Sequence, residues 1–145
     1  MVVFMFMGEY HNSIDDKNRL TIPSKFRNSL GENFVITRGI DNCLFVYNKE
    51  EWIQIINKYK ELPNTKDARK FMRVFLSGAI ECTFDKQGRV SLTSPLIEYA
   101  ALKKECVIIG VNDRLEIWDR ENWNKFMEDT TDISDIADNL FSSTI

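Results

Sequence analysis

The chain has 145 residues, of which 43% are hydrophobic and 12% aromatic. This composition excludes a globally disordered chain and allows one ordinary domain or two small ones sharing a core. The net charge is −3, but five acids and no Lys or Arg lie between Glu128 and Ile145, which leaves 17 of the 22 acids against all 19 basic residues in residues 1–127. Nucleic-acid binding needs only a local basic surface, so the overall charge does not exclude it.

The sequence gives little indication of a disulfide bond, a metal site or a membrane-spanning segment. Cys43, Cys82 and Cys106 are odd in number, widely spaced and set among apolar residues, and His11 is the single histidine. This pattern predicts free buried thiols in a reducing compartment, with no metal site and no cofactor. The apolar start, residues 1–7, lacks a basic flank and falls short of the ~20 residues that span a bilayer. We therefore expect a leading strand in a soluble cytoplasmic protein without a membrane partner.

The first half of the chain reads as a strand, a turn and a second strand, followed by further elements. Residues 8–14 and Arg19–Ile22 have strand character, and we expect a β-hairpin with Asp16–Asn18 at its tip. The elements expected next are a short helix over 23–30, strands over 34–37 and 43–47, a helix capped by Asn48 with Glu51 as its capping-box partner, and a helix over 65–77.

The two longer helices each carry one apolar stripe, at i, i+3, i+4 and i+7. The stripes consist of Trp52, Ile55, Ile56 and Tyr59 in the first helix and Ala68, Phe71, Met72 and Phe75 in the second. The second helix also carries a basic face, formed by Lys66, Arg69, Lys70 and Arg73 and opposed only by Asp67. Such a face is either a solvated surface or a contact for nucleic acid or an acidic partner.

From Gly78 the order of elements starts again. A turn over 85–89, a short helix over 94–101, strands over 107–109 and 114–118, and a Trp-bearing helix capped by Asp119 follow at an offset of 70 to 72 residues. We interpret this as an internal duplication, with a first repeat and its linking helices over 1–77, a second repeat over 78–127 and an acidic tail over 128–145. In the tail, Ile133, Ile136 and Leu140 form either a weak helical stripe that docks or part of a frayed terminus.

Both repeats carry Asp-x-x-x-Arg in the turn, as Asp15 with Arg19 and Asp85 with Arg89. Asn18 and Gly88, each just before the Arg, tolerate the left-handed backbone of a type I turn with a G1 bulge. The Asp–Arg pairs have two interpretations. They are either exposed cross-turn ion pairs worth ~0–1 kcal/mol, or carboxylates that orient guanidinium groups for bidentate contact with guanine.

In the second interpretation, Lys17 and Lys86 at the turn tips are available for phosphate contacts, which position a protein on DNA without specifying sequence. Enzyme signatures are missing: the sequence has no Gly-rich phosphate loop, no G-x-S-x-G and no metal-ligand spacing. His11 and Ser13 would share a strand face but lack a third member. We expect a protein that is not an enzyme and has no small-molecule substrate.

Several segments together resemble the MraZ family, which is related to the AbrB/SpoVT and MazE-type swapped-hairpin proteins. The segments that carry the resemblance are Gly8-Glu9-Tyr10, Asp15-x-x-x-Arg19-Leu20-Thr21-Ile22-Pro23, Arg38-Gly39-Ile40-Asp41, Leu76-Ser77-Gly78-Ala79, Asp85-Lys86-Gln87-Gly88-Arg89 and Glu116-Ile117-Trp118. The similarity extends from Met5 to about Met127. Asn18 stands where the family usually has Gly, and Thr93 where the second repeat usually has Pro.

The resemblance implies a mainly β, α+β fold in which the two repeats form a double-split β-barrel. It also implies a homo-oligomer in the form of a closed ring, and a cytoplasmic, nucleoid-associated transcriptional regulator. Its partner would be double-stranded DNA at promoter repeats of its own division and cell-wall operon, usually repressed, and contacted through Asp15, Arg19, Asp85 and Arg89. An antitoxin-like module that holds a protein partner is the first alternative, RNA binding the second.

Overall fold

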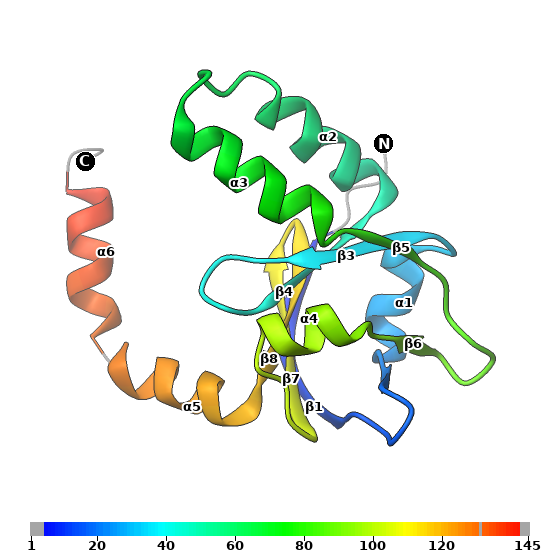
Figure 1. Ribbon diagram of the computed structural model, residues 1–145. Helices are drawn as coiled ribbons and strands as arrows, with labels where there is room; N and C mark the ends of the chain where they lie inside the picture. Colours follow the sequence, from blue (N-terminus) through cyan, green and yellow to red (C-terminus); the bar gives the residue numbers. More distant parts are fainter. Residues whose placement is uncertain (1–4, 131, 143–145) are drawn as a thin grey trace.

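The structure, a computed structural model, describes residues 5–130 and 132–142 (Figure 1). Its strands are β1 (Phe6–Ser13), β2 (Arg19–Thr21), β3 (Phe34–Arg38), β4 (Leu44–Asn48), β5 (Ile80–Cys82), β6 (Arg89–Ser91), β7 (Glu105–Asn112) and β8 (Arg114–Asp119). Its helices are α1 (Ser24–Leu30), α2 (Lys49–Tyr59), α3 (Lys66–Ser77), α4 (Ser94–Tyr99), α5 (Arg120–Asp129) and α6 (Ile133–Phe141). The start of the expected leading strand, residues 1–4, lies outside the described residues.

The strands form two antiparallel sheets. One has six strands in the order β1-β7-β8-β4-β3-β5, and the other pairs β2 with β6. Among the described residues the larger sheet is open, with β1 and β5 as its edge strands. The mixed α+β class predicted from the sequence is confirmed, whereas closure into a double-split barrel is not shown and stays a prediction.

The predicted local hairpins are wrong in their pairing. After the turn, β2 leaves β1 and pairs with β6 of the other repeat, placing Leu20 opposite Val90, while β1 pairs along its whole length with β7. The first turn is closed by an isolated bridge between Ile14 and Leu20 and by the Asp15 amide, which donates to the Arg19 carbonyl at 3.0 Å. The physical reason is that β1 satisfies its ladder hydrogen bonds with an eight-residue partner, and the cross-repeat pair buries both Leu20 and Val90 almost completely.

The large sheet has an apolar layer on each face, and the strand β4 shows why. Leu44 and Val46 point into a core shared with α1, α4 and the β2–β6 pair, whereas Phe45 and Tyr47 point into a second cluster. The second cluster lies under α2 and α3, whose predicted apolar stripes pack on it (Figure 1). Stacking of Trp52 on Phe75 joins the two helices to this cluster. The α2 stripe, with Phe71 and Phe75 of the α3 stripe, therefore packs on the core of the chain itself, whereas Ala68 and Met72 line a surface groove.

Helix starts follow the predicted caps. The side chain of Asn48 accepts a hydrogen bond from the Glu51 amide at 2.8 Å, and Asp119 accepts one from the Asn122 amide at 3.3 Å. Thr65 and Thr93 cap α3 and α4 in the same way. Thr93, where the family usually has Pro, thus contributes a capping hydroxyl.

The three cysteines are buried and free, as predicted. Burial raises the pKa of the Cys82 thiol to about 11 and that of Cys106 to about 12, so both remain protonated at neutral pH. Within the described residues, no helix is long and apolar enough to cross a membrane.

The helices α5 and α6 form an arm that leaves the body at the left of Figure 1. The tail stripe predicted from Ile133, Ile136 and Leu140 forms the nine-residue helix α6, which buries none of its residues. The helix predicted as one of the two tail conformations is therefore observed for residues 133–141, whereas docking of its stripe is not seen among the described residues.

Candidate nucleic-acid interface

The two Asp-x-x-x-Arg turns, residues 15–19 (loop 1) and 85–89 (loop 2), have the same backbone. In loop 1 the Asn18 amide donates to the Asp15 carbonyl at 3.1 Å, and in loop 2 the Gly88 amide donates to the Asp85 carbonyl at 3.0 Å. Asn18 and Gly88 adopt left-handed φ angles of 60° and 75°. The predicted turn with a left-handed residue before the Arg is therefore confirmed in both copies.

Each aspartate uses its two oxygens for different tasks. Asp15 Oδ1 accepts from the amides of Lys17 and Arg19 at 3.0 and 2.8 Å, while Oδ2 accepts from Arg19 Nε at 2.7 Å. Asp85 does the same with the amides of Gln87 and Arg89 and with Arg89 Nε, the last at 2.7 Å. One carboxylate thus shapes the turn and orients the guanidinium group.

These contacts favour the ionised carboxylates. The pKa of Asp15 is lowered chiefly by the hydrogen bond from the Arg19 backbone amide. The Arg19 guanidinium group and the Lys17 amide lower it further, while desolvation raises it. The pKa of Asp85 is lowered in the same manner, chiefly by the Arg89 amide. Both carboxylates are about one-third exposed, so the pairs lie at the surface.

The two loops form one continuous surface because each is bound to the other repeat. The Ile22 amide donates to the Gly88 carbonyl at 3.1 Å, and the Leu92 amide donates to the Asn18 carbonyl at 2.8 Å. In addition, Arg89 Nη1 lies 3.8 Å from Asp15 Oδ2. The structure therefore brings together all four charged residues that the sequence placed in two distant motifs.

The outer ends of the loops carry free cations. Lys17 and Lys86 are exposed at the tips, and in the part of the chain that the structure describes neither has an ion-pair or side-chain hydrogen-bond partner. Among the described residues, neither Nη1 nor Nη2 of Arg19 has a hydrogen-bond partner. In contrast, Arg89 Nη2 donates to Gln87 Oε1 at 3.0 Å. Loop 2 consequently holds its arginine more firmly than loop 1.

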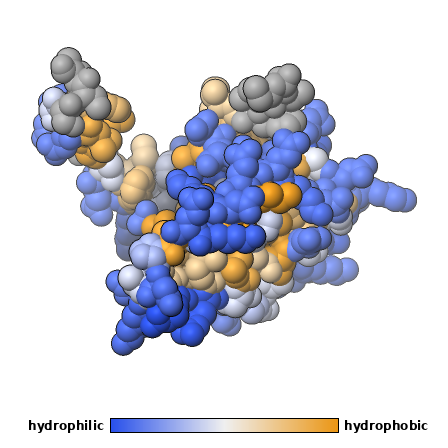
Figure 2. Space-filling view, turned by 90° about the horizontal axis from the view of Figure 1, so that it is seen from above, coloured by the Kyte–Doolittle hydropathy of each residue, from blue (hydrophilic) through white to orange (hydrophobic). Residues whose placement is uncertain are grey.

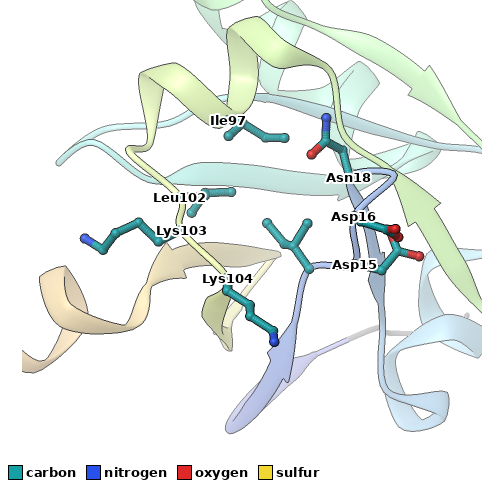
Figure 3. Close-up of a pocket in the computed structure, with 8 residues that line it drawn as sticks. Asp15, Asp16, Asn18, Ile97, Leu102, Lys103 and Lys104 are labelled. Atoms are coloured by element: carbon teal, nitrogen blue, oxygen red, sulfur yellow. The ribbon is translucent and has the colours of Figure 1, made fainter.

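A residue that the sequence interpretation missed sets the loops apart. Arg27 of α1 donates from Nη1 to the Ile22 carbonyl at 3.1 Å, and its Nη1 would lie 1.7 Å from a Cβ added to Gly88. The corresponding residue in α4 is Ile97, which lies near Asn18 and lines a cavity of about 520 Å³ beside loop 1 (Figure 3). Aligning the two repeats reveals this Arg-to-Ile difference in the sequence, but not its position over the loop.

His11 and Ser13 of β1, which the sequence placed on one strand face, each contact a glutamate. His11 Nε2 lies 2.8 Å from Glu9 Oε2, and Ser13 Oγ donates to the Glu105 carboxylate at 2.9 Å. Across the described residues, no group of three His, Cys, Asp or Glu side chains is placed to hold a metal ion.

The protein is built from two α+β repeats whose strands β2 and β6 pair with each other. Each repeat presents the same carboxylate–guanidinium turn, and the two turns share one surface. These features define a duplicated-domain protein. Comparison with known families gives two successive matches, over residues 5–74 and 75–142, to the family described as "MraZ protein, putative antitoxin-like". The chain belongs to the MraZ family. This membership agrees with the duplication and places the protein in a class of transcriptional regulators or antitoxin-like modules.

Proposed function

We propose that the protein is a sequence-specific DNA-binding transcriptional regulator that reads promoter DNA with loops 1 and 2. The observation that carries this proposal is that Arg19 and Arg89 are both held at Nε by an aspartate. In the part of the chain that the structure describes, fixing Nε leaves both Nη nitrogens of Arg19 available to a ligand, whereas Arg89 Nη2 also donates to Gln87 Oε1. A pre-oriented fork suits the O6 and N7 atoms of guanine.

The arrangement of the loops supports DNA rather than a small anion as the ligand. The antiparallel β2–β6 ladder is three residues long and carries one loop at each end, and a two-stranded β-element is narrow enough to enter a major groove. Lys17 and Lys86 at the tips would contact phosphates and fix the register of the protein on the duplex. A protein with this role needs no catalytic group, and we propose that it is not an enzyme.

One chain gives only two short loops, so affinity would come from assembly. We propose a homo-oligomeric ring of double-split barrels that engages repeated elements in the promoter of its own operon and represses it. When several chains of one ring bind the same DNA, each bound chain raises the effective concentration of the next without any new contact. Because these chains contact several phosphates at once, the affinity would fall steeply as the salt concentration rises.

An antitoxin-like module that holds a protein partner is the second candidate. The exposed apolar residues of α6, with Leu140 63% exposed, favour it, as does the printed description of the family. In that case partner binding would depend on α6 and not on Arg19 or Arg89.

Fluorescence anisotropy with a labelled duplex from the region upstream of its gene tests the DNA proposal. We expect Arg19→Ala and Arg89→Ala each to weaken binding by about fivefold or more, since a bidentate base contact is worth ~1–3 kcal/mol. Lys58→Ala, at an exposed position of α2, is the matched control and should leave the affinity unchanged. Unaltered affinity in both Arg variants, or binding that is flat between low and physiological salt, would overturn the proposal.

A further inference from the structure

The outward face of the β2–β6 ladder carries two hydroxyl side chains beside the two arginines. The middle residue of each strand is buried, so the residues on either side of it face outward. These outward residues are Arg19 and Thr21 in β2, and Arg89 and Ser91 in β6. Thr21 and Ser91 are exposed, and among the described residues neither hydroxyl has a hydrogen-bond partner. The face between loops 1 and 2 thus presents two polar groups in addition to the guanidinium groups.

The strand register places each hydroxyl directly opposite an arginine of the other repeat. Thr21 faces Arg89, and Ser91 faces Arg19. Backbone hydrogen bonds join the register positions just beyond both ends of the ladder. Because hydrogen-bonded and non-hydrogen-bonded pairs alternate in an antiparallel ladder, both outward pairs are of the non-hydrogen-bonded kind, with Cα atoms about 4.5 Å apart. Each outward pair therefore combines a guanidinium group and a hydroxyl group at close range.

The two pairs differ by one methyl group. Thr21 carries a methyl group opposite Arg89, whereas Ser91 has only a hydroxyl opposite Arg19. We infer that Thr21 is a specificity-determining residue, which contacts the C5-methyl group of a thymine next to the guanine bound by Arg89, and that Ser91 makes no such contact. A threonine methyl suits the thymine methyl in a major groove, and successive bases of a strand lie ~3.4 Å apart. The inference rests on the proposed binding of DNA by loops 1 and 2.

The arginines leave room for a short side chain to reach the bases. Each guanidinium group is bound at Nε by the aspartate of its own turn, so it is drawn toward one end of the ladder. The hydroxyl residue opposite each arginine stays exposed. An arginine that extended straight out of the ladder would hold the strands away from the base edges. Arginines bound toward the turns instead allow the ladder to approach the bases closely enough for a threonine methyl to touch them.

The position of Thr21 is better fixed than that of Ser91. Asn12 Nδ2 donates to the Thr21 carbonyl at 2.8 Å. The matching position of the second repeat holds Cys82, whose thiol donates to a carbonyl of its own strand. The arginine opposite Thr21 is also the one with the additional contact to Gln87. A methyl–methyl contact acts over a short range, so it discriminates best where the backbone and the neighbouring guanidinium group are both fixed.

The basic face of α3 is an alternative source of DNA affinity. Its residues Lys66, Lys70 and Arg73 are exposed. The side of the molecule that includes α2 and α3 is seen from above in Figure 2, and much of it is hydrophilic. Cations on such a surface contact phosphates, which carry no sequence information. The helix α3 can therefore add affinity, but it cannot distinguish thymine from uracil.

Replacement of thymine by uracil tests the inference, because uracil lacks only the C5-methyl group. Duplexes from the region upstream of the gene carry uracil at one thymine position at a time, and fluorescence anisotropy measures the affinity for each. We expect one uracil to weaken binding of the wild type about fourfold, which corresponds to the burial of one methyl group. That position should adjoin a guanine whose replacement weakens binding of the wild type but not of Arg89→Ala.

Variants at the two hydroxyl positions separate the methyl group from the hydroxyl group. Thr21→Ser keeps the hydroxyl and should bind the thymine and uracil duplexes equally, whereas Thr21→Val keeps a methyl group and should retain the preference for thymine. Ser91→Thr adds a methyl group opposite Arg19 and should create a second position at which thymine is preferred. Arg73→Ala, on α3, is the control and should leave each thymine-to-uracil ratio unchanged. Circular dichroism verifies the folding of each variant.

The outcomes separate this contact from the function on which it rests. Absence of DNA binding overturns the contact and the proposed function together. Binding that depends on Arg19 and Arg89 but is equal for thymine and uracil at every position overturns the contact alone. A preference for thymine that persists in Thr21→Ser also overturns the contact, because another residue then detects the methyl group. Loss of the preference in Thr21→Ser, with its retention in Thr21→Val, supports the contact.

Discussion

Asp15 and Asp85 link backbone shape to side-chain orientation, because one oxygen of each carboxylate binds turn amides and the other binds an arginine Nε. Loss of the negative charge would therefore disturb both the turn and the guanidinium group. Repetition singled out these residues in the sequence, and the family resemblance gave them their expected role in DNA contact. It could not show that the two pairs lie next to each other, because that depends on a strand pairing between residues 70 positions apart.

The carboxylates should titrate at low pH. We expect NMR titration to place the pKa of Asp15 and Asp85 below the ordinary ~3.9, because amide and guanidinium contacts favour the charged form. The folded-state pKa is lowered, so the stabilisation is fully present above the unfolded pKa and is lost as pH falls through the folded value. Arg19→Ala keeps the backbone amide, the main cause, and should raise the Asp15 pKa only in part. A pKa at or above 3.9 in the wild type would contradict this account.

Gly88 is the position in loop 2 where an added Cβ would meet the guanidinium group of Arg27. We expect Gly88→Ala to lower the free energy of unfolding by ~1–2 kcal/mol from its left-handed φ alone, and further because the Arg27 guanidinium must move. Chemical denaturation of Gly88→Ala, Arg27→Ala and the double variant separates the loss due to the left-handed φ from the loss due to the clash with Arg27. Only the loss due to the clash disappears when Arg27 is replaced. Additive losses in the double variant would show that Arg27 does not restrict Gly88.

At the scale of elements, the sequence predicted most helices and strands because their signals are local. Thr65 and Gly78 bracket α3 as a capping hydroxyl and a terminating glycine, and the four apolar positions of α2 follow the helical period. The hairpins failed for a reason that is not local. Residues 8–14 and Arg19–Ile22 look like adjacent strands joined by a tight turn, and nothing in that segment indicates that β7 and β6 are better partners.

The matched caps offer a test at this scale. Asn48 and Asp119 begin α2 and α5, are almost fully buried, and bind a second element as well, through the Ser29 carbonyl for Asn48 and the Lys103 amide for Asp119. We expect Asn48→Ala and Asp119→Ala each to reduce the free energy of unfolding by ~1–2 kcal/mol or more. Thr65→Ala removes an exposed cap and should cost less in the same denaturation experiment. Equal losses at all three positions would mean that the second contacts contribute nothing.

At the scale of the whole molecule, the family match over both halves agrees with the duplicated order of elements. The repeats are not independent bodies, because β2 and β6 form a sheet with one strand from each. The predicted limits of 1–77, 78–127 and 128–145 therefore describe sequence periods rather than separate folding units. We expect the two repeats to unfold in one cooperative transition.

The Leu20–Val90 pair at the centre of the β2–β6 sheet tests whether the two repeats unfold together. Leu20 and Val90 face each other and are 0% and 1% exposed. We expect Leu20→Ala and Val90→Ala each to cost about 2 kcal/mol or more, and the double variant to lose less than their sum because the side chains share one cavity. Val74→Ala, 47% exposed on α3, is the control and should change stability by less than ~0.5 kcal/mol. A two-step transition in any of these variants would contradict joint folding.

The cross-paired strands have a consequence for the ancestry of the chain. A protein with a single repeat would leave β2 without its partner, so it would need a second identical molecule to complete the sheet. Joining two such molecules end to end makes that dimer permanent and frees its halves from symmetry. Arg27 beside Gly88 and Ile97 beside Asn18 are differences that no symmetric dimer could hold. The fused chain can thus carry two unlike loops, one beside Arg27 and the other beside Ile97.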